Sequence, residues 1–210
     1  QTPSNFFATS TTPGANGIST DLAPDIIGKL VWEPGYGHWE LKGIVRFFQD
    51  RLNAHNHVAI GGGAGLAAVL PLTPTLNFIA EGLVGQGIGR YASTIGADLV
   101  ASPSGKIVPI AAFHFMGGLE WHPTKEWDIY AYYGIEHYAR TAYTGTPIGY
   151  GSPSADLSGC AVEDPGTRPC QPANATISQV QPGFWYRMIT SDVGSIALGL
   201  SYSYTHRTVW

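Results

Sequence analysis

The sequence predicts an all-β protein, an antiparallel up-and-down transmembrane β-barrel to which these residues contribute about eight strands. Two observations favour this fold. Apolar and polar residues alternate along successive long segments, as in strands with one face in lipid and the other in water. Tryptophan also stands on both sides of two short Pro-containing turns, as Trp32/Trp39 and Trp121/Trp127. Because an indole ring prefers an apolar layer and its N–H a wet one, these pairs predict an aromatic girdle at a membrane–water interface.

The composition agrees with a surface that lipid covers. Charged residues make up only 12% of the 210 residues, well below the roughly 25% of an average soluble domain. The net charge of −4 argues against nucleic acid as a partner, because that would require a basic surface. The longest apolar stretches are interrupted by glycine and are too short for a spanning helix. Strands are therefore the elements expected to cross a bilayer.

The alternation defines the strands to within about 2–4 residues at each end, at 25–33, 38–49, 57–72, 76–90, 109–122, 127–142, 177–189 and 193–207. It is clearest in 127–140, where Trp127 and Ile129 share one face and Asp128 lies on the other. Segment 76–90 fits least well, because glycines interrupt it and Glu81 and Arg90 fall on opposite faces, so we expect a bulge there. In 57–72 one face is mostly Gly and Ala, which leaves room for an inward-folded loop.

The connections alternate between short ones, at 34–37, 73–75, 123–126 and 190–192, and long ones, at 50–56, 91–108 and 143–176. Outer-membrane barrels pair short periplasmic turns with long extracellular loops, so the Trp pairs are expected at the periplasmic rim. Both ends of the chain then lie on the long-loop side. We therefore expect residues 1–24 to be an extracellular loop-like segment, residues 25–210 to hold the barrel strands, and the chain to be part of a larger barrel.

Four stretches resemble a family of porin-like bacterial outer-membrane proteins that are usually described as hypothetical: PDIIGK at 24–29, GIVRFFQDR at 43–51, LEWHP at 119–123 and GFWYR at 183–187. The resemblance covers 24–210. It implies the C-terminal part of a longer barrel, followed by a final strand that is absent here, and a location in the bacterial outer membrane. It carries over no binding or catalytic residue, and it makes a homotrimer an arrangement to test.

The polar face of the predicted strands carries nine charged residues that are candidates to line a pore: Lys29, Glu40, Lys42, Arg46, Glu120, Asp128, Glu136, Arg140 and Arg187. A water-filled lumen solvates such groups, whereas Lys or Arg on the lipid face is destabilising by roughly 2–4 kcal/mol at mid-bilayer. Two interpretations stay open. The residues form a constriction that selects solutes by size and electric field, or they form salt bridges that only brace the inner wall.

Four aromatic residues also point inward on this pattern: Tyr130, Tyr132, Tyr138 and Trp185. They either stack against sugar rings or other flat solutes, or they fill and stiffen the wall. The sequence leaves both alternatives open, so selectivity is predicted only as far as small polar solutes.

Cys160 and Cys170 are the only cysteines, and both lie in the long loop at 143–176. Pairing is the simplest account of them, so the sequence predicts a disulfide and an oxidising compartment. His55 and His57 stand two residues apart, but two ligands do not make a metal site. We expect neither a metal nor a cofactor.

The predicted function is passive diffusion of small polar solutes through a porin-like channel in the outer membrane. We expect no enzyme activity, since Ser152 lacks the Gly-x-Ser-x-Gly frame of a nucleophile elbow. One alternative is a structural or adhesive outer-membrane barrel with a plugged lumen. Another is a secreted soluble β-sandwich that binds a partner. The sandwich would bury Trp127, Ile129 and Ile135 against a second sheet, whereas the barrel leaves them on its outer surface.

Overall fold

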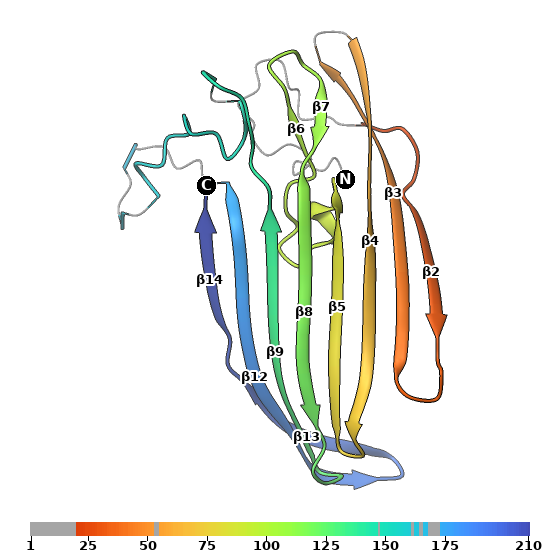
Figure 1. Cartoon of the computed structure of the whole chain (residues 1–210). Coiled ribbons are helices and arrows are strands. Elements are labelled where there is room, and N and C mark those ends of the chain that lie inside the picture. The colour runs from red at the N-terminus through yellow and green to blue at the C-terminus, as the bar shows by residue number, and fades with distance from the viewer. Residues whose placement is uncertain (1–19, 53–54, 147, 161, 164–165, 168–172) are drawn as a thin grey trace.

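The structure, a computed structural model, describes residues 20–52, 55–146, 148–160, 162–163, 166–167 and 173–210. Within these ranges, no helix is long and apolar enough to cross a membrane. A single antiparallel sheet of ten strands dominates the described chain (Figure 1). The predicted all-β, antiparallel up-and-down fold is therefore confirmed.

The strands of the sheet follow one another in chain order. They are β1 (Thr20–Asp21), β2 (Ile26–Trp32), β3 (His38–Leu52), β4 (His55–Thr73), β5 (Leu76–Gln86), β8 (Ala111–Trp121), β9 (Trp127–Tyr138), β12 (Asn174–Ser191), β13 (Gly194–Ser201) and β14 (Tyr204–Val209). Both β1 and β2 pair with β3, and both β13 and β14 pair with β12. Nine of the ten strands lie in the eight segments that the alternation predicted, with β13 and β14 sharing the last, whereas β1 lies within 1–24, where a loop-like segment was expected. Among the described residues β2 and β14 do not pair with each other, so the sheet is open.

Three strand ends differ from the predicted positions, within the margin of about 2–4 residues given for them. Pairing of β3 with β4 continues to Leu52 opposite His55, so the long loop expected at 50–56 is instead the end of a hairpin. Inside this hairpin His57 Nδ1 lies 2.9 Å from Asp50 Oδ1. Strand β9 ends at Tyr138, and residues 141–142 form the separate strand β10 (Thr141–Ala142), which pairs with β11 (Gly149–Tyr150).

The third strand end that differs is that of β5. Gly87 turns the chain with a φ of +68°, a conformation that costs glycine little, and its N–H bonds to the carbonyl of Ile110 at 2.8 Å. Arg90 therefore lies beyond the strand, which is why Glu81 and Arg90 did not share a face. The register of β5 with β8 shows no shift along its length, and the shift in its pairing with β4 lies on β4, between Pro71 and Thr73. The bulge expected in 76–90 is therefore wrong.

The four predicted short turns lie at one end of the sheet, and the β3–β4 hairpin and the long connections lie at the other (Figure 1). Strand β2 starts and β14 ends at the long-connection end, as the alternation predicted. In the first short turn, Gly35 and Gly37 have φ values of +91° and +76°. At Gly37 a Cβ atom would also stand 2.8 Å from the carbonyl oxygen of Val69. This turn therefore requires glycine.

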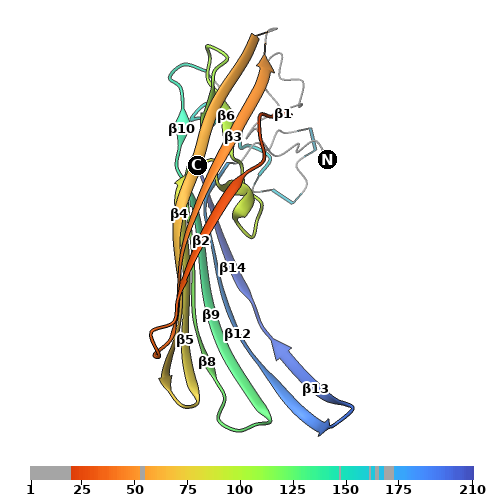
Figure 2. The ribbon, with the colours of Figure 1, turned by 90° about the vertical axis from the view of Figure 1, so that its right-hand side faces the viewer.

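Residues 87–110, which we call the inward segment, fold onto the concave face of the sheet (Figure 2). The segment contains η1 (Gly89–Tyr91), β6 (Leu99–Ala101) and β7 (Ile107–Pro109). It packs closely on β4, where a Cβ atom at Gly63 would stand 3.3 Å from Cγ2 of Ile88. The expectation that the bare face of 57–72 admits an inward-folded loop is thus confirmed.

The buried core lies between this segment and the concave face. Ile88, Leu99 and Ile110 of the segment are buried, as are Phe48 and Tyr138 of the sheet. The convex face is apolar and exposed instead. Its exposed large side chains include Leu30, Leu41, Val45, Val58, Ile60, Leu66, Val84, Phe113, Phe115, Leu119, Leu198 and Leu200.

Trp127, Ile129 and Ile135 decide between the barrel and the sandwich alternatives. All three stay partly exposed, and in the described chain the core forms against the inward segment rather than against a second large sheet. This is the outcome expected of a barrel wall.

Candidate functional site

The concave face carries the predicted charged residues. Side chains on one face of a strand recur every second residue, and directly opposed residues of neighbouring strands share a face. By register Lys29 opposes Lys42, and Asp128 opposes Trp185. Arg46 on the same face reaches the inward segment. The candidate site is therefore this face together with the segment folded over it.

Arg46 holds the inward segment to β3. Its guanidinium, fully buried, lies 2.7 Å from Asp98 Oδ1 and 3.0 Å from Asp25 Oδ2, and it also donates to the carbonyl of Gly87. Asp98 belongs to the inward segment, and its side chain is only 3% exposed. Charges this deeply buried are tolerated only when they are paired and hydrogen-bonded, so these contacts fix the position of the segment.

Glu136 holds the same segment to β9. Its carboxylate accepts hydrogen bonds from the backbone N–H groups of Ser93 (2.8 Å) and Thr94 (3.3 Å). It also accepts from the hydroxyl groups of Thr94 and, at 3.2 Å, Tyr138. Two predicted pore-lining residues, Arg46 and Glu136, thus act as anchors of the inward segment.

Two side chains of the inward segment, Tyr91 and Asp98, have raised pKa values. Partial burial and the nearby Asp25 carboxylate raise the pKa of Tyr91 to about 12, so its hydroxyl stays protonated and donates to Asp25 at 2.7 Å. Burial raises the pKa of Asp98, while the neighbouring Arg46 acts in the opposite direction. The contacts of both residues are therefore sensitive to how tightly the segment is packed.

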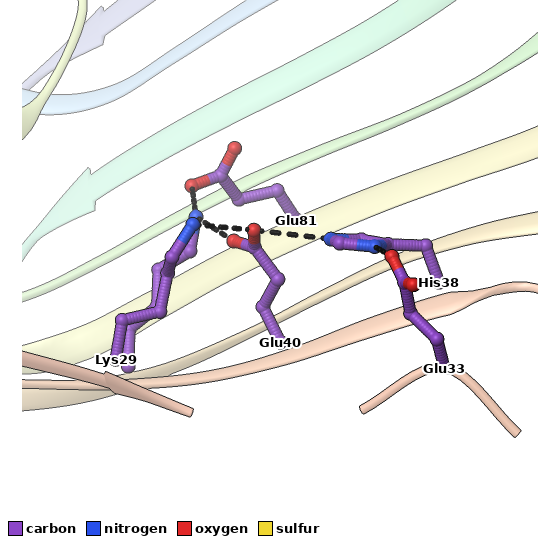
Figure 3. Close-up of polar contacts among 6 residues, drawn as sticks. Lys29, Glu33, His38, Glu40 and Glu81 are labelled. Carbon is purple, nitrogen blue, oxygen red and sulfur yellow. Dashed lines mark hydrogen bonds and ion pairs between the residues drawn. The ribbon is translucent and has the colours of Figure 1, made fainter. Parts of the chain in front are cut away.

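A second group of charges crosses the concave face nearer the short turns, and we call it the charge ladder: Lys29, Glu33, His38, Glu40, Lys42 and Glu81 (Figure 3). Glu40 is its centre, with Oε1 2.7 Å from Lys29 Nζ and 3.1 Å from His38 Nε2, and Oε2 3.2 Å from Lys42 Nζ. His38 Nδ1 also lies 3.0 Å from Glu33 Oε1.

Lys42 extends the charge ladder across a whole strand. It stands on β3, yet its Nζ lies 2.6 Å from Glu81 Oε1 on β5. Between them β4 presents Gly65, which opposes Lys42, and Ala67, which opposes Glu81. The small residues of β4 therefore leave the path open for a long side chain.

The other half of the face, on β8, β9 and β12, has fewer charges. Asp128 Oδ1 lies 2.6 Å from His122 Nδ1, and its other oxygen pairs with Arg187. Arg187 also donates to the carbonyl of Lys125 at 3.1 Å, and Glu120 accepts from the hydroxyl of Tyr132. These contacts lie close to the short-turn end of the sheet.

Three aromatic residues of this half lie against glycines, and we call Tyr130, Tyr132 and Trp185 the aromatic strip. The glycines directly opposite them across the strands are Gly183, Gly118 and Gly199, respectively. A cleft of about 420 Å³ runs beside the strip. Tyr138 is different, because it is buried under the inward segment. One of the four inward aromatics thus fills the wall, while the other three line a cleft.

Arg140 is the remaining predicted pore-lining residue. It follows β9 at the long-connection end. Its Nε donates to the carbonyl of Gly151 at 2.6 Å, and its guanidinium lies 5.4 Å from the ring centre of Trp210. All nine predicted residues therefore have a polar partner, but they form separate groups rather than one ring. Whether they line a pore stays a prediction.

Sequence reasoning missed Asp25, Tyr91, Asp98 and Glu81 as members of the site. The first three act only because the inward segment folds back onto β3, a contact between residues far apart in the sequence. For Glu81 a signal existed, since it follows the alternation of β5 once the strand is ended at Gln86.

The predicted girdle tryptophans all adjoin short turns. Trp32 opposes Trp39 directly across the first turn, while Trp121 ends β8 and Trp127 begins β9. Trp127 also packs against Phe184 and Tyr186, with ring centres 5.5 and 4.7 Å apart. Their positions suit a girdle, and that role stays a prediction.

The remaining groups that the sequence singled out are the two histidines and the two cysteines. His57 is paired with Asp50, and the described residues contain no cluster of three or more metal-ligating side chains. The predicted disulfide joins Cys160 to Cys170, which lies outside the described residues, so this pairing stays a prediction.

Comparison with known proteins gives a likeness of fold. No model of a known protein family matches the chain, and no curated protein matches it. The chain is similar to the crystal structure of the outer membrane channel DcaP of Acinetobacter baumannii, with a TM-score of 0.66 and 15% identity, over 91% of this chain and 48% of that chain. It therefore spans about half the length of that solved structure. The likeness agrees with a barrel wall as the fold of the described sheet.

Proposed function

We propose that this chain forms part of the wall of a porin-like channel in the bacterial outer membrane, through which small polar solutes diffuse passively. The observation that carries the proposal is the contrast between the two faces of the sheet. The convex face is a band of exposed Leu, Ile, Val and Phe side chains, which suits lipid tails. The concave face bears charges and polar clefts, which suit water. The fold of the DcaP channel supports the same assignment.

In this proposal the inward segment narrows the passage. Arg46 and Glu136 hold it from two well-separated strands, β3 and β9, so its position is defined. A cleft of about 780 Å³ remains beside it, lined by Glu81, Glu120 and Gln181 among other polar residues. This remaining space is consistent with a passage that the inward segment narrows but does not fill. We assign the chain no catalytic step.

The second candidate is a structural or adhesive barrel whose lumen is plugged. It is favoured by the same segment, because the segment buries much of the concave face of β3 and β9 near the long connections. The two candidates differ in whether solutes pass, and transport decides between them. The proposal also includes a bacterial outer-membrane location with contact to the lipid bilayer, which membrane fractionation tests. It includes a homotrimer as well, which cross-linking tests.

The experiment is a swelling assay with liposomes that contain the full-length folded protein. We expect uptake of arabinose and slower uptake of larger sugars, with a matching conductance in planar bilayers. The variant Arg46→Met should release the inward segment and raise the conductance. A folded, membrane-inserted protein that passes neither ions nor arabinose, with or without this change, would contradict the channel and favour the plugged barrel.

A further inference from the structure

The three side chains of the aromatic strip lie over glycines of the neighbouring strands. A Cβ atom at Gly183 would stand 2.5 Å from the hydroxyl oxygen of Tyr130, and one at Gly199 would stand 2.5 Å from the Trp185 ring. A Cβ atom at Gly118 would overlap Tyr132 in the same way. Each ring therefore occupies the space that a missing side chain on the next strand leaves. The strip extends obliquely over β8, β9, β12 and β13.

Trp185 supplies the exposed ring of the strip. It is 49% exposed although it stands on the concave face. An exposed indole there has no apolar layer to cover it, so its surface is available to a solute. Tyr130 and Tyr132 are stacked on each other, with ring centres 5.2 Å apart and planes 29° apart, so each covers part of the other ring.

Polar groups border the aromatic strip in the cleft that runs beside it. Its lining includes the carboxylates of Glu120 and Asp128, the amide of Gln181 and the imidazole of His122. These groups supply acceptors and, from the amide, donors. Among the described residues that line the cleft there is no lysine or arginine, and the nearby Arg187 is paired with Asp128. An anionic solute would find no free positive charge on this surface.

An exposed indole ring with a polar border matches the surface of a sugar ring, which has an apolar C–H face and hydroxyl groups around its edge. The cleft of about 420 Å³ also lies within the range of roughly 300–1,000 Å³ that small-molecule sites occupy. We propose that the aromatic strip is a stacking subsite for a neutral sugar ring. The proposal rests on the channel function and names the solute class for one stretch of its wall.

The test measures binding without transport. Saturation-transfer difference NMR is recorded on the full-length protein, folded in detergent micelles, with maltotriose as the probe. We expect transfer to the ring protons of the sugar, and the variant Trp185→Leu should weaken the affinity by about tenfold, as the loss of one stacked ring implies. Trp185→Phe, which keeps an aromatic face, should restore most of the affinity.

The matched control is Tyr133→Leu, which removes an exposed aromatic side chain from the opposite face of β9 and should leave the affinity unchanged. Absence of transfer to maltotriose, or equal transfer in Trp185→Leu and wild type, would overturn the subsite. Preferential binding of choline over maltotriose would overturn it as well, because a cation would then be the ligand. Binding is measured in micelles and therefore does not depend on transport. If the protein binds maltotriose but passes no solute, only the channel is rejected. If it conducts but does not bind maltotriose, only the subsite is rejected.

Discussion

The two halves of the concave face use glycine in the same way but place different chemistry over it. On β3 to β5, Gly65 leaves the path open for Lys42 to reach Glu81 across a strand. On β8 to β13, glycines lie under the rings of the aromatic strip. In the first half the crossing side chain ends on a partner of opposite charge. In the second half Tyr132 donates to Glu120, whereas the Trp185 ring stays half-exposed.

This difference teaches that a bare strand on a barrel wall is not by itself a weak point. Glycine costs a strand side-chain packing, and an overlying side chain from the neighbour restores it. Where that side chain is charged, it pairs with an opposite charge on the wall, so the polar groups of the wall satisfy each other. Where it is aromatic, the wall gains a surface for solutes. The predictions below either separate the two halves further or show that they behave alike.

The largest effect is expected from Arg46→Met, which removes the most buried charge of the first half. Asp98 would then be left buried without its nearest cation, and loss of one partner of a buried pair costs about 3–5 kcal/mol. We expect faster proteolysis within 87–110 and a lower free energy of unfolding in urea. The control Arg90→Met removes a more exposed guanidinium, which lies 3.8 Å from Asp98, and should cost much less. Equal losses in both variants would contradict the anchoring role of Arg46.

This anchor also shows where sequence reasoning stopped. The strands could be predicted because their alternation is local, and the parity of Arg46, Glu40 and Lys42 followed from it. The approach of the inward segment was foreseen from the bare face of 57–72. Its partners were not, because no pattern within the segment indicates that Asp98 lies against β3. Gly87, whose left-handed conformation ends β5, is the local signal that would have placed the turn correctly.

The second largest effect is expected from Gly199→Ala in the aromatic half. The new methyl group would stand 2.5 Å from the Trp185 ring, and relieving such a clash costs about 1–3 kcal/mol. The matched control is Gly134→Ala on the same face, where the nearest atom is the carbonyl oxygen of Phe115 at 3.8 Å. We expect a shift of tryptophan fluorescence and a lower urea midpoint only in Gly199→Ala. If both variants unfold alike, the ring does not lie over the glycine.

A smaller effect is expected from Tyr91→Phe, which removes the hydrogen bond to Asp25 and should cost about 0.5–1.5 kcal/mol. The pKa of Tyr91 is raised from 10.0 to about 12. Because the protonated form is favoured in the folded protein, this contribution is complete below pH 10 and is lost as the pH rises toward 12. The phenolate difference spectrum of wild type minus Tyr91→Phe should therefore have its midpoint near pH 12. A midpoint at the ordinary value would mean that the Asp25 contact is absent.

The smallest effect on stability is expected from Lys42→Met, although it breaks the link of the charge ladder between β3 and β5. The Lys42 side chain is 28% exposed and that of Glu81 is 51% exposed, so water can replace each partner, and exposed pairs contribute about 0–1 kcal/mol. A double-mutant cycle with Glu81→Gln, measured by urea unfolding, should give a coupling energy in that range that falls further in high salt. A coupling above about 2 kcal/mol would exceed that range and place the ladder with the buried pair of Arg46. The two halves of the wall would then differ in strength as well as in chemistry, since only the charged half would be held by strong pairs.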